Sequence, residues 1–385
     1  MNKIKIVHII GSLSTGGAER FAVDLCNELA KNAFYQVYII SLCKNNSQDV
    51  ISQDISKQVK CLCFNKKSGF SPSVYIKLTK WFINVKPEIV HTHLNAFEYV
   101  LLYSLLSKKS RFFHTLHNMA QHESPKFLPA KYLRTLFYKY GKVKPITISR
   151  NGSETYRQHY NLKNDIRIEN GRPNLKLSEE RERLHNLYKS NSDDFLLVHI
   201  GRISEEKNQA LLIDVVQKFN RLESKKCKLL IIGTGIDENL HKRLLKKVKN
   251  DPQIEFLGVR KNIGDYLSIA DAFCMGSTFE GMPIVLIEAL SMGCMPISTP
   301  VGGIPQMITH GITGFLSKDI SLESYYETLK QALFSPEKAV IQNNCINAFK
   351  TYYHIEISAE AYSNVYYSML NNKNILSMDG NKVEA

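Results

Sequence analysis

Short apolar runs alternate with longer amphipathic stretches along almost the whole chain of 385 residues. In the first half, apolar runs predict strands at 4–10, 36–42, 59–63, 88–92, 111–116 and 145–149, and amphipathic stretches predict helices at 17–31, 72–85, 95–107 and 127–140. In the second half, strands are expected at 195–200, 227–232, 254–257, 272–275, 295–298 and 314–316, and helices at 207–222, 237–249, 262–268, 284–292, 303–309, 321–334 and 337–349. This alternation is typical of βαβ units and predicts an α/β fold with two doubly wound parallel sheets.

The length of the chain exceeds what one ordinary hydrophobic core supports, so we expect two domains. The first is placed at 1–165 and the second at 166–350, with a hinge in the Asn-, Gly- and Pro-containing segment 161–175. Residues 351–370 are rich in tyrosine and predict a final helix, which can either end the second domain or return to the first. The remainder, 371–385, is polar and is expected to be a tail.

The overall composition is that of an ordinary globular protein, with 44% hydrophobic and 22% charged residues. The sequence contains no run of about 18 apolar residues that would span a bilayer. Eight scattered cysteines lack the paired spacing of a zinc site and favour reduced thiols, so we expect a cytoplasmic protein.

The net charge of +14 is distributed very unevenly. Residues 1–170 hold 25 Lys and Arg against 11 Asp and Glu, whereas the remaining residues are balanced at 25 each. Nucleic acid, an anionic membrane face or a phosphorylated acceptor would each explain this excess, but no nucleic-acid-binding motif is present. The segment 125–144 is aromatic, apolar and basic without any acidic residue, which suits either an anionic bilayer or a helix packed on the sheet.

Two glutamates, Glu280 and Glu288, bracket an apolar segment that opens with Gly281 and Pro283. Proline is tolerated in the first turn of a helix, so we expect a buried helix over 283–292 that carries the second glutamate. Eight residues make a little over two helical turns, so both carboxylates can reach one side of a cleft. A polyhydroxylated ligand would satisfy them there; alternatively, the first is a helix N-terminal charge and the second is a solvated or core-paired residue.

Two cations follow the predicted strand 195–200 directly, in the segment 201–208. Arg202 and Lys207 are five residues apart and flank the start of the next predicted helix. Two cations beside a helix N-terminus can bind a diphosphate, unless they are surface charges that pair with Glu205 and Glu206. No Asp-x-Asp motif occurs in the chain, so the cations would have to neutralise a diphosphate without a metal clamp.

Polar residues also follow three predicted strands of the first half. Gly16 and Gly17 form a loop that permits close backbone approach to a phosphate. His93 ends one strand, and His117 and Asn118 end the next, at the sheet edge where ligands bind in doubly wound folds. A lone histidine is more often structural, and the spacing of these histidines does not indicate a metal site.

Together these motifs resemble the retaining glycosyltransferases of family 4, whose signature is F-E-G-x-P-x-x-x-x-E-A-x-x-x-G-x-P. Every element of it is present in the segment 279–296, and the resemblance extends over nearly the whole chain. It implies the GT-B fold, in which two Rossmann-like domains face a central cleft and the C-terminal helix packs on the first domain. It assigns the acceptor to the N-terminal domain and the nucleotide sugar to the C-terminal one.

The resemblance also implies roles for individual residues and no metal cofactor. Catalytic roles are expected for Glu280, His117, Arg202 and Lys207, and acceptor contacts for His93 and Asn118. The expected donor-binding residues are Gly16, Gly17, Arg202, Lys207, Gly233, Val259, Glu280, Gly281, Met282, Pro283, Ile284 and Glu288.

The resulting functional prediction is transfer of a hexose-type sugar from a nucleotide sugar, with UDP-sugar favoured, to a glycan or lipid-linked acceptor. Cell-surface polysaccharide or glycolipid synthesis is the expected setting, with the enzyme in the cytoplasm or peripheral at the inner membrane face. A UDP-sugar 2-epimerase of the same fold and a non-catalytic nucleotide-sugar-binding protein are the alternatives. The sequence leaves the sugar, the nucleotide and the acceptor open.

Overall fold

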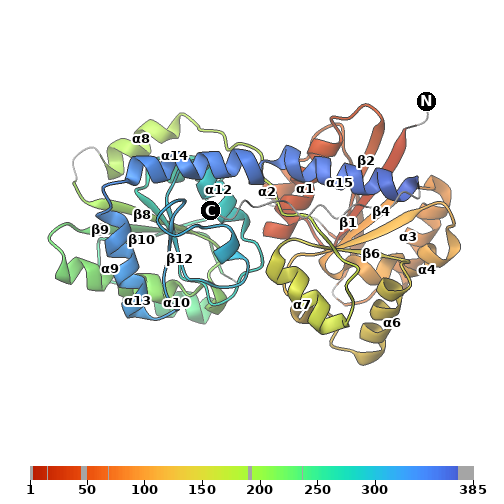
Figure 1. Ribbon diagram of the computed structural model, residues 1–385, viewed down its shortest axis with the longest axis horizontal. Helices are drawn as coiled ribbons and strands as arrows, with labels where there is room; N and C mark the ends of the chain where they lie inside the picture. Colours follow the sequence, from red (N-terminus) through yellow and green to blue (C-terminus); the bar gives the residue numbers. More distant parts are fainter. Residues whose placement is uncertain are drawn as a thin grey trace. The chain divides into compact units, whose positions relative to one another are not determined.

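The computed structural model describes residues 3–14, 16–44, 50–67, 69–189, 193–235 and 237–371. The chain divides into two compact units: unit 1 comprises Met1–Gly171 and Ile355–Ala385, and unit 2 comprises Arg172–His354. The chain therefore passes from one unit to the other after Gly171 and returns after His354 (Figure 1). Within the hinge predicted at 161–175, Ile166–Arg167 form a strand of unit 1, so the connection itself lies further along the chain.

Within the described residues, unit 1 holds a seven-stranded parallel sheet in the order β3-β2-β1-β4-β5-β6-β7. Its strands are β1 (Ile4–Ile10), β2 (Tyr35–Cys43), β3 (Lys60–Lys66), β4 (Ile89–His93), β5 (Arg111–Leu116), β6 (Lys144–Thr147) and β7 (Ile166–Arg167). The strand order reverses between β1 and β4, which pair in register from Ile6 opposite Ile89. In doubly wound sheets this reversal opens a crevice at the carboxyl ends of the strands.

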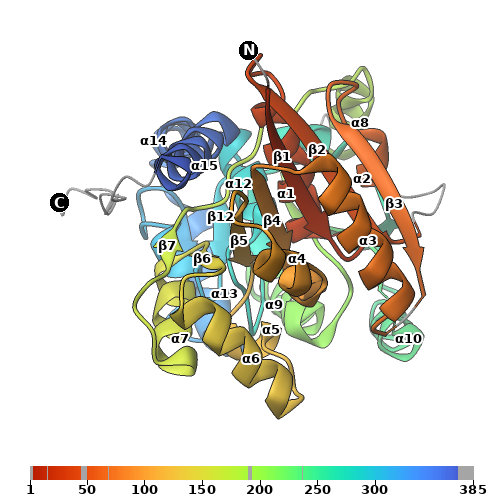
Figure 2. The same ribbon diagram turned by 90° about the vertical axis from the view of Figure 1, so that its right-hand side faces the viewer.

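Helices cover both faces of this sheet (Figure 2). They are α1 (Gly17–Leu29), α2 (Val50–Gln53), α3 (Pro72–Val85), the 3-10 segment η1 (Leu94–Val100), α4 (Leu101–Leu106), α5 (Ala120–Glu123), α6 (Leu128–Lys139), α7 (Arg150–Tyr160) and the C-terminal α15 (Ile355–Leu370). One face packs its core against α3, η1, α4, α6 and α7. On the other face α1 contacts α15, whose buried Tyr362 and Tyr366 reach the sheet, so the tyrosine-rich end of the chain belongs to unit 1.

Unit 2 holds a six-stranded parallel sheet in the order β10-β9-β8-β11-β12-β13 among the described residues. Its strands are β8 (Phe195–Ile200), β9 (Cys227–Ile232), β10 (Ile254–Gly258), β11 (Ala272–Met275), β12 (Pro296–Ser298) and β13 (Phe315–Leu316). Its helices are α8 (Glu180–Tyr188), η2 (Glu205–Lys207), α9 (Gln209–Leu222), α10 (Glu238–Lys247), α11 (Ile263–Ile269), α12 (Ile284–Ser291), η3 (Ile304–Gln306), α13 (Leu322–Leu333), α14 (Lys338–Ala348) and η4 (Phe349–Tyr353). Here the strand order reverses between β8 and β11.

The predicted α/β class and the two parallel sheets are confirmed, and each predicted strand lies within two residues of an observed one except where β3 runs on to Lys66. Helices α7 and α8 were not predicted, because few of their side chains are apolar: α8 buries Leu184 and otherwise consists mostly of polar residues. The helix predicted at 303–309 is only the short turn η3. The one predicted at 95–107 is observed as the 3-10 segment η1, with non-helical backbone at Asn95, followed by α4.

No helix in the described ranges has both the length and the apolar composition needed to cross a bilayer. The predicted tail at 371–385 lies outside the described residues, apart from its first residue, Asn371.

Candidate active site

The loop after β8 carries both predicted diphosphate-binding cations. Arg202 is exposed, whereas Lys207 is half-buried at the end of η2. Asn208 follows with a φ of 48°, in the left-handed region that glycine and asparagine tolerate best. Asparagine is therefore suited to this position, where the chain turns from η2 into α9.

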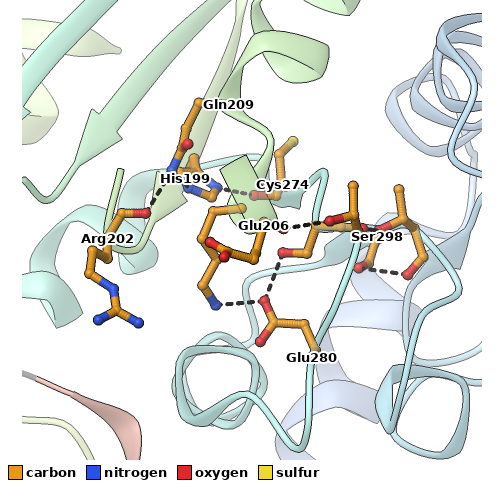
Figure 3. Close-up of polar contacts among 11 residues, drawn as sticks. His199, Arg202, Glu206, Gln209, Cys274, Glu280 and Ser298 are labelled. Carbon is orange, nitrogen blue, oxygen red and sulfur yellow. Dashed lines mark hydrogen bonds and ion pairs between the residues drawn. The ribbon is translucent and has the colours of Figure 1, made fainter. Parts of the chain in front are cut away.

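Lys207 and Glu280 form an ion pair across the reversal point of the sheet, 2.5 Å between Nζ and Oε1. Lys207 follows β8 and Glu280 follows β11, and these strands are neighbours, so the topology brings the two side chains together. The Ser277 hydroxyl donates to the same carboxylate oxygen at 2.7 Å (Figure 3). Glu280 is 7% exposed, so this carboxylate is buried and paired.

The alternative in which the cations pair with neighbouring glutamates of their own loop is not what the structure shows. Glu205 instead pairs with Arg243 at 2.7 Å. Glu206 accepts a hydrogen bond from the Ser204 hydroxyl, which together with nearby Arg202 holds the pKa of Glu206 below its usual value. Arg202 lies apart from the Glu280 carboxylate in Figure 3.

A second loop, residues 299–303, contacts the backbone of the segment that carries Glu280. Gly302 has a φ of 58°, and a Cβ atom there would lie 1.7 Å from the Glu280 carbonyl oxygen. Gly303 donates its N–H to the Gly281 carbonyl at 2.9 Å, and the Thr299 hydroxyl donates to the Ser277 carbonyl at 2.6 Å. This close backbone contact requires glycine and fixes the position of the loop that carries the carboxylate.

Two buried residues that the sequence analysis missed, His199 and Gln209, hold the backbone of Arg202 through hydrogen bonds. The Nδ1–H group of His199 donates to the Cys274 carbonyl at 2.9 Å, which leaves its Nε2 as the acceptor for the Gln209 amide at 3.1 Å. The same amide nitrogen donates to the Arg202 carbonyl at 3.0 Å (Figure 3). Burial lowers the pKa of His199 to about 4, so the ring stays neutral.

Glu288 lies on α12, as predicted, and its carboxylate pairs with an arginine that the sequence did not reveal. Arg172 contacts Oε1 of Glu288 through both Nη2 at 2.7 Å and Nε at 2.9 Å. Both side chains are 7% exposed, so this is a buried ion pair. The backbone N–H of Arg172 also donates to the Tyr353 carbonyl at 2.9 Å, which ties together the two chain segments that lead to unit 1.

Within the described residues, neither Arg202 nor Glu288 makes a hydrogen bond or ion pair with the Lys207–Glu280 pair. The structure therefore joins one predicted acid to one predicted cation, and gives the other acid a partner of its own.

The remaining predicted donor-binding residues of unit 2 lie on loops at the carboxyl edge of the sheet, except Ile284, which begins α12. Gly233 has a φ of 136° and presses on the backbone of Gly201, where a Cβ atom would lie 2.0 Å from the carbonyl oxygen. Val259 is 49% exposed. Gly281 precedes Met282, Pro283 and Ile284, of which Met282 and Ile284 are buried and Pro283 forms the N-cap of α12.

In unit 1 the predicted residues lie at the carboxyl ends of β1, β4 and β5. Gly16 is the N-cap of α1, Gly17 is its first residue, and a Cβ atom on Gly16 would lie 2.2 Å from the Glu19 carboxylate. His93 ends β4 and His117 follows β5, and the two rings are hydrogen-bonded at 2.9 Å between Nδ1 and Nε2. The predicted loop and histidines therefore lie at the carboxyl edge of the sheet, at and next to the point where the strand order reverses between β1 and β4.

His93 and His117 belong to a buried ladder of histidines. Nε2 of His93 is hydrogen-bonded to Nδ1 of His8 on β1 at 2.9 Å. Burial lowers the pKa of His8 and His117 to about 3 and that of His93 well below its usual value, so all three rings are neutral. A neutral ring carries one N–H group, so the two hydrogen bonds must run in the same direction along the ladder.

The outer end of this ladder, Nδ1 of His117, is buried and has no hydrogen-bond partner. Its backbone N–H donates to Glu123 at 2.7 Å, and Asn118 also hydrogen-bonds this glutamate, which sequence reasoning missed. Burial raises the pKa of Glu123 to about 8, against the opposing effect of these N–H donors. A ligand hydroxyl at His117 would satisfy the unpaired nitrogen whichever way the ladder is oriented.

His8, His91 and His93 also place nitrogen atoms within 4.8 Å of one another. Their rings are stacked, with an angle of 7° between His91 and His93, and His91 is already hydrogen-bonded to Tyr366 at 2.5 Å and to Thr115 at 2.7 Å. Stacked rings cannot direct their lone pairs at a common ion, so this cluster has the geometry of a hydrogen-bond network and not of a metal site.

Two family models match the chain in consecutive segments. The model for glycosyltransferase family 4 matches residues 15–170, and the model for group 1 glycosyl transferases matches residues 180–348. The chain belongs to the family 4 glycosyltransferases. Between them the matches include the histidine ladder beyond His8, the cation loop and both glutamates.

Curated relatives extend the similarity over most of the chain. An uncharacterized glycosyltransferase of Methanocaldococcus jannaschii is 26% identical over 331 residues, which cover 75% of this chain and 79% of the relative. The UDP-Gal:alpha-D-GlcNAc-diphosphoundecaprenol alpha-1,3-galactosyltransferase of Escherichia coli is 25% identical over 403 residues, covering 97% of this chain and 99% of the relative. This family 4 chain is thus an enzyme of the glycosyltransferase class.

Solved structures identify the fold. A glycosyltransferase from Rickettsia africae has a TM-score of 0.80 at 18% identity, covering 97% of this chain and all of that one. HepE of Anabaena, solved in complex with UDP, has a TM-score of 0.77 at 16% identity, covering 95% of this chain and all of that one. The predicted GT-B fold is confirmed.

Proposed function

We propose that this glycosyltransferase moves a hexose-type sugar from a nucleoside diphosphate sugar, with UDP as the favoured nucleotide, to a lipid-linked or glycan acceptor with retention of anomeric configuration. The observation that carries the proposal is the buried Lys207–Glu280 pair at the reversal point of the unit 2 sheet. Support for UDP and for a lipid-linked acceptor comes from the name of the Escherichia coli relative and from the UDP complex of HepE. In this proposal unit 2 holds the donor and unit 1 holds the acceptor.

The donor would be held by two cations, of which Lys207 is already fixed by its ion pair with Glu280. An ammonium group has three N–H donors, so Lys207 can keep Glu280 and still bind a phosphate oxygen. The exposed guanidinium of Arg202 would take a second phosphate oxygen. Both cations meet negative charge that grows on the leaving diphosphate as the bond to the sugar breaks.

The two glutamates would bind hydroxyl groups. The contacts of Glu280 with Lys207 and Ser277 both use Oε1, so we assign Oε2 to a hydroxyl of the transferred sugar. The contacts of Glu288 with Arg172 also use Oε1, and its Oε2 is assigned to the ribose. Retention follows if the acceptor oxygen attacks the anomeric carbon from the face that the diphosphate leaves, while the departing phosphate oxygen takes the acceptor proton.

We also propose that the reaction needs no metal ion and that the enzyme works in the cytoplasm, at the membrane face that carries its acceptor. Support for metal independence comes from the two cations and from the lack of an Asp-x-Asp motif in the sequence. Unchanged transfer after treatment with a chelator is the expected result, and loss of activity restored by Mg²⁺ or Mn²⁺ would overturn this part.

The test begins with a thermal-shift screen of UDP-, GDP- and ADP-sugars, since a ligand that binds the native state raises the melting temperature. Sugars that stabilise the protein are then assayed for transfer to diphosphoundecaprenol-linked acceptors, and the anomeric configuration of the product is determined by NMR. If the protein converts the donor sugar into its epimer when no acceptor is present, the activity is epimerisation and not transfer.

The variants to compare are Lys207→Met and, as a control at a more exposed ion pair, Lys228→Met. Lys228 also forms a 2.5 Å ion pair, with Glu255, but on β9, away from the reversal point. Transfer is expected to fall at least about 100-fold in the first variant and to stay near wild type in the second. Equal activity in the two variants would contradict the assignment of the diphosphate to Lys207.

A further inference from the structure

Helix α6 of unit 1 turns apolar side chains outward and an arginine inward. Leu128 is 75% exposed and Tyr132 is 67% exposed, whereas Arg134 is 2% exposed. Arg134 donates to the Glu98 carboxylate at 2.5 Å and to the Glu123 carbonyl at 2.9 Å. Phe137 and Tyr138 on its inner side are buried as in an ordinary packed helix. Such a helix carries polar residues on its outer side, so packing alone does not explain the exposed apolar side chains of α6.

The two helices beside α6 continue this pattern. Figure 2 shows α3, α4 and α6 next to one another in front of the sheet of unit 1. The N–H group of Leu102 on α4 donates to the Tyr75 hydroxyl of α3 at 3.0 Å, which joins these two helices. Their outward apolar side chains are Ile76, Ile83, Leu102, Leu105 and Leu106, all between 39% and 59% exposed.

The charged side chains among these apolar ones are all positive. Residues 72–86, 101–111 and 125–144 contain no Asp or Glu. Their exposed cations are Lys77, Lys80, Lys86, Lys108, Lys109, Lys126, Lys139 and Lys142. The nearby Glu98 is paired with Arg134, and Glu123 has a raised pKa because it is buried, so neither offsets the lysines.

We call the outward side chains of α3, α4 and α6, with Lys108, Lys109, Lys126, Phe127, Tyr140 and Lys142 at their ends, the basic apolar surface.

We propose that the basic apolar surface docks unit 1 onto the surface of an anionic lipid bilayer. Its leucines and isoleucines can enter the interface between headgroups and acyl chains, while lysines extend to the lipid phosphates. Tyr132 and Tyr140 have the amphipathic rings that favour this depth, and Phe127, at 70% exposed, adds apolar area. The bilayer is the occupant for which both the charge and the apolar side chains have a partner.

A second copy of the chain fits this surface less well. A two-fold contact would bring its lysines against the same lysines, with no acidic residue of the surface to pair with them. A polyanion such as nucleic acid would pair with the lysines but would leave the exposed leucines without a partner. The docking proposal is compatible with a lipid-linked acceptor, and it is tested by lipid binding, which does not depend on the transfer reaction.

The test is sedimentation of the full-length protein with vesicles of phosphatidylcholine alone and of phosphatidylcholine mixed with phosphatidylglycerol. Binding is expected with the anionic vesicles, and it should weaken as salt is raised because the charges are screened. Lys108→Gln with Lys126→Gln is expected to lower the partition coefficient about fivefold for each lysine removed.

Matched leucine pairs separate this surface from general exposure of apolar side chains. Leu105→Ser with Leu128→Ser alters α4 and α6, whereas Leu187→Ser with Leu222→Ser alters side chains of unit 2 that are 66% and 62% exposed. The first pair is expected to reduce vesicle binding by about tenfold or more, and the second to leave it unchanged. Retained thermal stabilisation by UDP in both double variants shows that fold and donor site are intact.

Equal vesicle binding by the two leucine variants would overturn the proposal, as would binding that is indifferent to phosphatidylglycerol. Sedimentation equilibrium of the same variants tests the second copy: a wild-type dimer that the first pair dissociates would assign the surface to self-association instead. If no donor sugar is ever transferred but binding follows the expected pattern, the proposed function fails while the docking surface stands.

Discussion

The Arg172–Glu288 pair offers a sharp test of how a predicted donor-binding residue works. Both side chains are 7% exposed, and the guanidinium contacts the carboxylate through two nitrogen atoms. Replacing one partner of a buried pair leaves the other charge without compensation and costs about 3–5 kcal/mol. For a domain of 150–250 residues, each kcal/mol corresponds to roughly 2–4 °C in melting temperature. Arg172→Met should therefore lower the melting temperature of unit 2 by roughly 6–20 °C.

The double variant Arg172→Met with Glu288→Leu removes both charges together. Apolar replacements of similar volume are often neutral or stabilising by about 1–4 kcal/mol, so its melting temperature should return to the wild-type value or exceed it. If Glu288 also binds the ribose, this stable variant will have lost the stabilisation by UDP that the wild-type enzyme shows. At 100 times the dissociation constant that stabilisation is about 2.7 kcal/mol.

The assay is differential scanning fluorimetry of the wild type, both single variants and the double variant, with and without UDP. An unchanged melting temperature in Arg172→Met would refute the claim that the pair is buried and uncompensated when broken. Full stabilisation of the double variant by UDP would show that Glu288 is only a core-paired residue, which is the alternative that the sequence left open.

Three further results are expected. Arg202→Ala should lower transfer by about 100-fold or more with stability changed by no more than about 0.5 kcal/mol, because the side chain is exposed; a normal rate would contradict its role. Gly302→Ala should lower the free energy of unfolding and the transfer rate more than Gly311→Ala does. Both glycines have a positive φ, but of the two only Gly302 has backbone atoms within 4 Å of the added Cβ. Equal losses in denaturation and transfer assays would rule out the contact. His8 and His117 have pKa values lowered to about 3 in the folded protein, so below pH 6.5 the unfolded chain binds more protons than the folded one. The free energy of unfolding should therefore be about 2 kcal/mol lower for each histidine at pH 5 than above pH 6.5, as measured by denaturant titration. No change with pH would contradict the burial of neutral rings.

The strands were accessible from the sequence because a buried parallel strand must be apolar on both faces. The predicted run 195–200 shows this, because it has the same bounds as β8. Helices were found where one side packs on the sheet, as for α3, where predicted and observed bounds agree at 72–85. Helix α8 was not predicted because its residues are mostly polar and show almost no periodicity of apolar positions.

For the candidate site, the spacing of Glu280 and Glu288 placed one acid on a loop and the other on a helix, and the structure agrees. It could not reveal Arg172, which is more than a hundred residues away in the chain. Nor could it reveal Glu123, whose carboxylate accepts a hydrogen bond from the His117 N–H because of the local path of the chain between β5 and α5. Local pattern identifies a chemical group, but its partner is chosen by packing.

The sequence by itself determined the α/β class, the two-part organisation and the identity of the acidic and basic motifs, because these follow from periodicity, from chain length and from near-neighbour spacing, respectively. Only the tertiary structure decided which charges pair. Lys207 meets Glu280 because β8 and β11 are neighbours at the point where the strand order reverses, and the order of strands in a sheet is not written in any local segment. The inward position of Arg134 on α6 was decided in the same way, since its partner is a glutamate on a different element, Glu98.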